Sequence, residues 1–174
     1  MSRRPIMSRR MLALCSTAVL LCTGVATPIS AENLLPIVGT WQLTEYSQLL
    51  LNTKEVIHPF GDHPIGYIQY SPGGHMLVFL TARELKRPAS STYTDAERAE
   101  IHKGIINGYV GTYTVDGNKV IHHVLTSSRP EFMGSDQIRY FEVDGKTLKI
   151  KTAPIKAVQS GQDVVATLTF EKIE

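Results

Sequence analysis

Residues 109–126 read YVGTYTVDGNKVIHHVLT, and this stretch decides the expected fold. Apolar and aromatic side chains recur in both halves, and the turn sequence Asp116-Gly117-Asn118-Lys119 separates Tyr109–Val115 from Val120–Thr126. Because glycine after aspartate supplies a positive φ at little cost, the stretch predicts two antiparallel strands joined by a tight turn. Two other turns between β-rich runs repeat the pattern, Ser71–Gly74 and Asp144–Lys146. Three successive hairpins predict an antiparallel meander.

The strand sequences indicate which sides are buried. Residues 147–152 alternate apolar and polar side chains, as in a strand with one buried and one wet face. Residues 76–80 differ, because Met76, Val78 and Leu80 face one way while Leu77 and Phe79 face the other. In a closed barrel the inner side of such a strand is core or pocket, and we expect a helix or loop over its outer side.

One helix is predicted. Thr94 and Glu97 form a capping box, with Thr94 at the N-cap and Glu97 three residues later. Ile101 and Ile105 then repeat at helical spacing, and Gly104 weakens the helix. One short amphipathic helix beside about eight strands suits a lid or plug on a barrel.

Four segments in this order carry a family resemblance. The first strand opens with a Gly-x-Trp pattern at Gly39 and Trp41, and the other segments contain glycine, tyrosine and turn residues at matching positions: residues 59–76, 111–124 and 134–145. From about residue 36 to about residue 154 the chain resembles the lipocalin-like domain family of bacteria and fungi.

The resemblance implies a mostly β fold, an antiparallel up-and-down calycin-type barrel of about eight strands with one short lid helix, wide enough for one small ligand. It implies structural roles for Gly39 and Trp41, with Trp41 in the core. Lipocalins often pack an arginine from a late strand over this tryptophan. The expected last strand, Asp163–Glu171, has no arginine, which leaves Arg139 as the nearby candidate. Arg139 is also expected to pair with Asp136.

The N-terminus has the parts of an export signal. The first ten residues contain four arginines and no acidic residue. An apolar run of about 16 residues follows, and the segment ends with the small residues Ser30-Ala31. Such a run is short for a bilayer core, which favours a cleavable signal peptide at 1–31, followed by one domain at 32–174. Cleavage after Ala26 is the alternative. Arg9-Arg10 leaves the twin-arginine and general export routes both open. The predicted location is periplasmic or secreted.

Loss of residues 1–31 would change the composition of the chain. Lys plus Arg falls from 18 to 14 against 16 Asp plus Glu, so the formal charge moves from +2 to −2. Nothing in this charge calls for nucleic acid or an anionic membrane as partner, and no stable membrane span is expected after cleavage. Both cysteines, Cys15 and Cys22, leave with the signal, which excludes a nucleophilic thiol or a zinc–thiolate site.

Histidine is the main candidate for chemistry. His122 and His123 are adjacent on a predicted strand, so one faces inward and one outward. We expect His123 inward, because Ile121, His123 and Leu125 would share a face. The register with Val120, His122 and Val124 inward is an equally apolar alternative. The inward histidine is a candidate base or ligand-orienting donor, or a buried histidine bonded to a neighbouring tyrosine or carbonyl.

The remaining candidates line a pocket or a turn. Expected ligand-binding residues are, besides His123, three tyrosines that combine flat apolar area with a hydroxyl and two apolar side chains: Tyr67, Tyr70, Tyr113, Met76 and Val78. Tyr109 belongs to the same group of tyrosines. Asp62 and His63 are interpreted as turn residues, since two donors do not make a transition-metal site. We predict no metal and no cofactor.

Three functions remain open. The first is an exported carrier that binds a small, largely apolar or aromatic molecule in the barrel. The second is a cofactor-independent isomerase, cyclase or decarboxylase that uses His123 or His122. The third is an envelope interaction protein, which would show an exposed apolar patch in place of a cavity. The signatures of common hydrolases and nucleotide-binding enzymes are absent from the sequence, which weighs against an enzyme.

Overall fold

The computed structural model describes residues 35–85, 88, 90–157 and 160–174. The chain divides into two units, residues 1–31 and residues 32–174, and the description below concerns the second. The predicted signal peptide at 1–31 lies outside the described residues.

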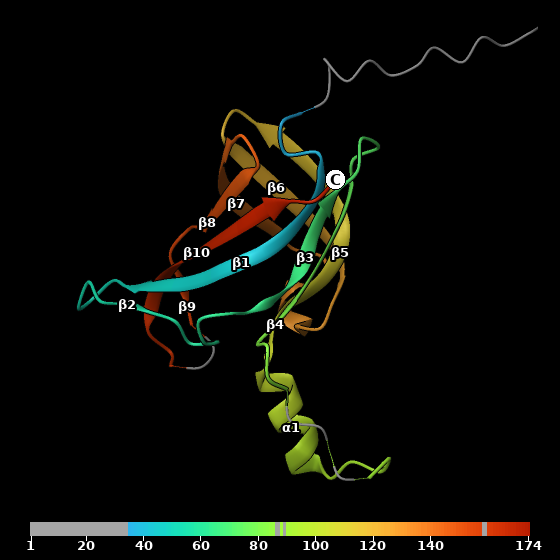
Figure 1. The fold of residues 1–174 in the computed structure, drawn as a ribbon, viewed down its shortest axis with the longest axis vertical. Coiled ribbons are helices and arrows are strands. Elements are labelled where there is room, and N and C mark those ends of the chain that lie inside the picture. Colours follow the sequence, from blue (N-terminus) through green and yellow to red (C-terminus); the bar gives the residue numbers. More distant parts are fainter. Residues whose placement is uncertain (1–34, 86–87, 89, 158–159) are drawn as a thin grey trace, which may run out of the picture. The chain divides into compact units, whose positions relative to one another are not determined.

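Eight antiparallel strands form a closed barrel (Figure 1). Each strand pairs with the next around the barrel, and β1 pairs with β10 to close it. This confirms the predicted calycin-type architecture of about eight strands. Two-residue strands β2 (Val56–Ile57) and β9 (Ile155–Lys156) extend the sheet beside β1 and β10. In order around the barrel the strands are β1 (Gly39–Leu50), β3 (Ile65–Tyr70), β4 (His75–Thr81), β5 (Ile105–Asp116), β6 (Lys119–Ser127), β7 (Asp136–Asp144), β8 (Thr147–Thr152) and β10 (Asp163–Lys172).

The three predicted hairpins are present. The first joins β3 to β4, the second joins β5 to β6, and the third joins β7 to β8. Gly117 and Gly145 lie in the last two turns with φ angles of 60° and 55°, the left-handed conformation that glycine adopts without a steric cost. Local turn chemistry therefore determines the order of the strands around the barrel.

The core lies inside the barrel, and Trp41 is fully buried in it. The indole N–H donates to the Ile37 carbonyl at 2.8 Å. The ammonium group of Lys172 lies 5.2 Å from the centre of the Trp41 ring, a cation–π distance. Lys172 is the final residue of β10, one residue beyond the predicted end of the last strand. The expectation that Arg139 packs over Trp41 was wrong, because a lysine occupies that position and Arg139 lies in another part of the barrel.

The bulge in β5 comes from a close backbone approach. The pairing of β5 with β6 shifts register between Val110 and Gly111. A Cβ atom at Gly111 would lie 2.0 Å from the carbonyl oxygen of His123, so any larger residue would push the two strands apart. The bulge permits this contact and changes which residues of β5 stand opposite those of β6.

Helix α1 (Asp95–Lys103) begins at the predicted capping box, in which Thr94 and Glu97 bond each other's backbone N–H groups. None of its residues is buried, so it does not plug the barrel. Among the described residues, nothing provides the expected full cover over the outer side of β4, since the side chains of Leu77 and Phe79 are 42% and 55% exposed. Across the described residues, no helix is long and apolar enough to cross a membrane.

Candidate functional site

The barrel encloses a small cavity of about 50 Å³. Its volume is enough for a few water molecules, since one needs about 10–15 Å³ by this measure. Its wall mixes apolar side chains, such as Ile68, Val78 and Leu168, with a buried polar group that consists of Tyr46, Gln48, Tyr109, His122 and Arg139. We call these five polar residues the inner cluster.

His122 lies at the centre of a hydrogen-bonded network. Its Nε2 atom lies 2.8 Å from the Tyr70 hydroxyl, and its Nδ1 atom lies 2.8 Å from the Tyr109 hydroxyl. Its side chain is almost fully buried. Burial, with smaller contributions from the positive charges of Arg139 and His123, lowers the pKa of His122 to about 3. The imidazole is therefore neutral at physiological pH.

A neutral imidazole has one N–H donor and one acceptor nitrogen. One of the two tyrosines therefore donates its O–H to His122, while the other accepts the imidazole N–H. The accepting tyrosine keeps its own O–H for another partner. Burial raises the pKa of both Tyr70 and Tyr109, so both hydroxyls stay protonated. Whichever tautomer is present, the network holds one tyrosine proton that His122 does not use.

Tyr46 contributes a second hydroxyl of this kind. The Gln48 amide donates to the Tyr46 oxygen at 2.9 Å, and both side chains are buried. Burial raises the pKa of Tyr46, so its hydroxyl also keeps its proton. Since the Tyr46 oxygen accepts from Gln48, its own O–H remains available to donate toward the cavity that it lines.

Arg139 brings a positive charge into this interior, with only 6% of its surface exposed. Its guanidinium donates to the Ile138 carbonyl at 2.8 Å and to the Gln137 side-chain oxygen at 3.2 Å, and it also bonds the Tyr109 hydroxyl, so all three partners are neutral. Among the described residues no carboxylate lies within 4.0 Å of it. The charge of Arg139 lowers the pKa of Tyr109 and Tyr46 against the larger effect of burial. Burying a charge without a counter-ion is costly, which marks Arg139 as a functional candidate.

A larger cavity of about 620 Å³, which we call the mouth, lies next to the inner one. The two share Phe60, Ile106 and Arg129. Arg129 bonds Glu131 at 2.7 Å and stacks 4.2 Å from the ring centre of Phe132. The rest of the mouth combines apolar side chains, two basic residues from the last turn of α1 and one acidic residue: Pro59, Ile105, Pro130, His102, Lys103 and Glu131. This volume is typical of small-molecule sites.

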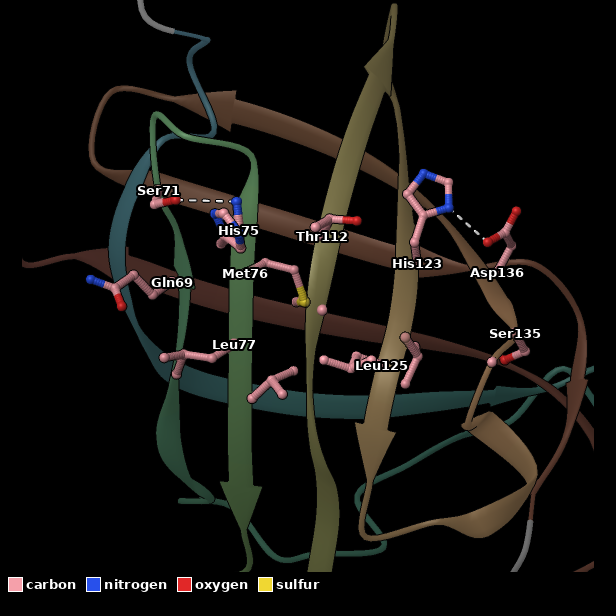
Figure 2. Close-up of a pocket in the computed structure, with 14 residues that line it drawn as sticks. Gln69, Ser71, His75, Met76, Leu77, Thr112, His123, Leu125, Ser135 and Asp136 are labelled. Carbon is pink, nitrogen blue, oxygen red and sulfur yellow. Dashed lines mark hydrogen bonds and ion pairs between the residues drawn. The ribbon is translucent and has the colours of Figure 1, made fainter.

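A second concavity, of about 550 Å³, lies on the outer face of β4, β5 and β6 (Figure 2). We call it the outer groove. Leu77, Val110 and Leu125 line it and are 42%, 40% and 74% exposed. At its edge His123 lies 2.7 Å from an Asp136 carboxylate oxygen, as the dashed line in Figure 2 shows. The other ring nitrogen of His123 lies 3.1 Å from the Thr114 hydroxyl.

Comparison with known proteins gives the family. The family model of a lipocalin-like domain matches residues 38–173. The chain belongs to the lipocalin-like domain family. A crystal structure of a mutant of the fluorescent protein UnaG matches with 16% sequence identity and a TM-score of 0.35, covering 80% of this chain and 97% of that one. No curated protein sequence matches the chain.

The lipocalin-like barrel places several predicted site residues inside. Tyr70, Tyr113, Met76 and Val78 are buried, as predicted for an inward face. Val78 lines the inner cavity and Tyr70 bonds His122. Met76 belongs to the core and also borders the outer groove. The Tyr113 hydroxyl donates to the Ser71 carbonyl at 2.9 Å, so it serves the β3–β4 turn.

Three predictions about this site were wrong. His123 is on the outer face and His122 is inside, because the barrel adopts the register with Val120, His122 and Val124 inward. Tyr67 points outward and is 46% exposed. The expected pair of Asp136 with Arg139 does not form, since Asp136 bonds His123 and Arg139 is inside the barrel. These errors share one cause, which is that the outer face of this barrel is also apolar.

The inner-cluster residues Tyr46 and Gln48 were missed by the sequence analysis. Both alternate with solvent-facing residues of β1 and share a face with the buried Leu50. Asp62 and His63 are both exposed. They follow a turn in which the Gly61 N–H donates to the His58 carbonyl. Within the described ranges no three His, Cys, Asp or Glu side chains lie close enough together to hold a metal ion.

Proposed function

We propose that this lipocalin-like chain is an exported binding protein that takes up a small molecule with an apolar body through the mouth of its barrel. The observation that carries the proposal is the continuity between the mouth and the inner cavity, which share Phe60, Ile106 and Arg129. The inner cavity of about 50 Å³ accommodates one end of a ligand, while the mouth of about 620 Å³ has room for its body.

Carrier function is favoured over acid–base catalysis by the state of His122. Both of its ring nitrogens are engaged by tyrosine hydroxyls, and its pKa of about 3 makes it a weak base. A general base for work near neutral pH needs a pKa closer to that pH. His122 therefore supports the neighbouring tyrosines, which orient the polar end of a ligand.

The mouth is tested by a pair of tryptophan substitutions on β5. Ile105→Trp adds bulk to the mouth, whereas Val110→Trp adds the same ring to the outer groove. We expect the neutral fluorescent dye N-phenyl-1-naphthylamine to bind the wild-type protein, and Ile105→Trp to weaken this binding at least tenfold, about 1.4 kcal/mol. Val110→Trp is expected to leave the affinity within twofold.

Fluorescence titration of the three proteins separates the two concavities. If Val110→Trp abolishes dye binding and Ile105→Trp does not, the ligand site is the outer groove and the barrel proposal fails. The same result would favour an interaction surface on β4, β5 and β6, where the apolar side chains are exposed. Absence of dye binding to the wild-type protein would also overturn the proposal.

Export is supported by the sequence of residues 1–31, with its basic start, apolar run and small residue before Glu32. When the full chain is expressed in a bacterial host, we expect the periplasmic protein to lack these residues. Intact mass spectrometry should give a mature N-terminus at Glu32, or at Thr27 for the alternative cleavage site. Full-length protein found only in the cytoplasm would contradict export. Replacing Arg9 and Arg10 by lysines tests the route, because twin-arginine export requires the arginine pair.

A further inference from the structure

The hydrogen-bond donors of the inner cluster exceed its acceptors, and this asymmetry identifies the ligand class. Arg139 has five N–H donors and no acceptor. Its partners are three neutral oxygens, of Ile138, Gln137 and Tyr109. Tyr46 lines the cavity and has a hydroxyl proton that Gln48 does not use. A cavity with these groups presents donors to whatever enters it.

The cluster also lacks a negative charge. Among the residues that the structure describes, no carboxylate side chain lines the inner cavity, whereas Arg139, Arg129 and Lys156 do. Arg129 is neutralised by Glu131, and Lys156 is exposed and bonds Asp163 at 3.0 Å. Arg139 is therefore the one inner arginine whose charge is not balanced by a carboxylate among the described residues. An anion that reached it would gain charge-assisted hydrogen bonds and would balance the buried charge.

We infer that the ligand is an organic acid with an apolar body, whose carboxylate is bound by Arg139 and the Tyr46 hydroxyl of the inner cluster. A carboxylate fits better than a bulkier anion because the cavity is only about 50 Å³, and a planar carboxylate matches the fork of a guanidinium. The apolar body occupies the mouth against Phe60, Ile105 and Pro130. At the mouth Arg129 and Lys103 are paired with Glu131 and Glu100, so the unbalanced positive charge that a carboxylate would meet is that of Arg139.

This inference rests on the proposed function, since it assigns the polar end of a molecule held in the barrel. The orientation is polar end inward and apolar body outward. A purely apolar ligand would not balance the charge of Arg139, so the buried arginine would only lower the affinity for such a ligand. Gln137 and the Ile138 carbonyl hold the guanidinium of Arg139 in place. Because these partners are neutral, the positive charge of Arg139 remains unbalanced.

The test uses a matched acid and alcohol. Decanoic acid and 1-decanol compete with bound N-phenyl-1-naphthylamine at pH 7.5, where the acid is ionised. For the wild-type protein we expect the acid to bind on the order of tenfold to hundredfold more tightly than the alcohol, since hydrogen bonds to charged groups contribute about 1.5–3 kcal/mol. Arg139→Met should reduce this ratio to within about threefold. Arg98→Gln removes a charge from the exposed face of α1 and should leave the ratio unchanged.

The stability of Arg139→Met provides a second readout. Because the substitution removes an uncompensated buried charge and keeps an extended side chain, we expect the ligand-free variant to be at least as stable as the wild type in urea unfolding. An arginine needed for packing alone would give a large loss of stability and no change in the acid-to-alcohol ratio, which would overturn the inference. Equal binding of acid and alcohol to the wild-type protein would overturn it while leaving the proposed function intact. Failure of the dye, the acid and the alcohol to bind would overturn both.

Discussion

Replacing Trp41 by alanine is expected to lower the free energy of unfolding by about 3–5 kcal/mol, the range for removing a large aromatic side chain from a core. Trp41 is fully buried, its N–H bonds the Ile37 carbonyl, and Lys172 lies over its ring. The substitution therefore removes packing, a hydrogen bond and a cation–π contact together. A domain of this size has a total stability of about 5–15 kcal/mol, so the loss is a large part of it.

The measurement is urea unfolding followed by far-UV circular dichroism, because Trp41 is the only tryptophan and its fluorescence is lost with it. Tyr140→Ala is the matched control, since this aromatic residue is 45% exposed on the outer face of β7. We expect the control to lose about 1 kcal/mol or less. Lys172→Gln removes the cation–π contact alone, and it should lower the free energy of unfolding by about 1 kcal/mol or less. If Trp41→Ala lowers the free energy of unfolding by less than about 1.5 kcal/mol, the stability of the barrel does not depend on this side chain.

The order of the strands was predictable because it depends on local chemistry. Tight turns at Asp116-Gly117 and Asp144-Gly145 join neighbours in sequence, and neighbours in sequence became neighbours in the barrel. The capping box at Thr94 fixed the start of α1 for the same reason. In each case the residues that form the feature lie within a few positions of one another.

The inward face of β6 was not predictable in this way. Its alternative registers were equally apolar, and the structure shows why: Leu125 is 74% exposed beside other uncovered apolar side chains of the outer groove. The bulge at Gly111 further changes the pairing of β5 with β6. A rule that assigns the more apolar face to the interior cannot decide between faces of similar composition. The family resemblance predicted the barrel but not its inner polar residues.

Arg139 illustrates the same limit. Charged side chains in strands are mostly exposed, so the sequence analysis placed Arg139 over Trp41 or in a surface pair. One signal in β7 pointed inward: Arg139 shares a face with the buried Phe141, while Ile138 and Tyr140 face solvent. Ile138 and Tyr140 hid this signal, because two apolar residues on the opposite face of β7 suggested that this face was the buried one. The missing counter-ion became visible only when every strand that surrounds the guanidinium was in place.

His122 is expected to make the barrel sensitive to mild acid. The pKa of its imidazole is about 3 in the folded protein, against the ordinary histidine value of 6.5 in the unfolded chain. Between these values the unfolded chain binds a proton that the folded protein does not, so the free energy of unfolding falls as the pH falls. The stability is fully present above about pH 7. About 2 kcal/mol should be lost between pH 7 and pH 5, with further loss toward pH 3.

The groups that face His122 account for its lowered pKa. Tyr70 on β3 and Tyr109 on β5 are neutral hydroxyls with raised pKa values, and Arg139 on β7 and His123 on β6 disfavour a second positive charge. No carboxylate is bonded to the imidazole to stabilise its protonated form. Protonation would make both ring nitrogens donors, so the tyrosine that donates to His122 would have to turn its O–H away and accept instead. The acid sensitivity therefore follows from the burial of His122 and from the bonding that suits its neutral form.

Urea unfolding at pH 7, 6 and 5 measures this effect. His122→Gln can still bond both tyrosines through its amide, yet it does not titrate in this range, so its stability should change much less with pH than that of the wild type. His58→Gln is the control, because His58 is exposed, and it should keep the wild-type pH dependence. A wild-type protein equally stable at pH 7 and pH 5, or a His122→Gln variant with an unchanged slope, would contradict the assignment.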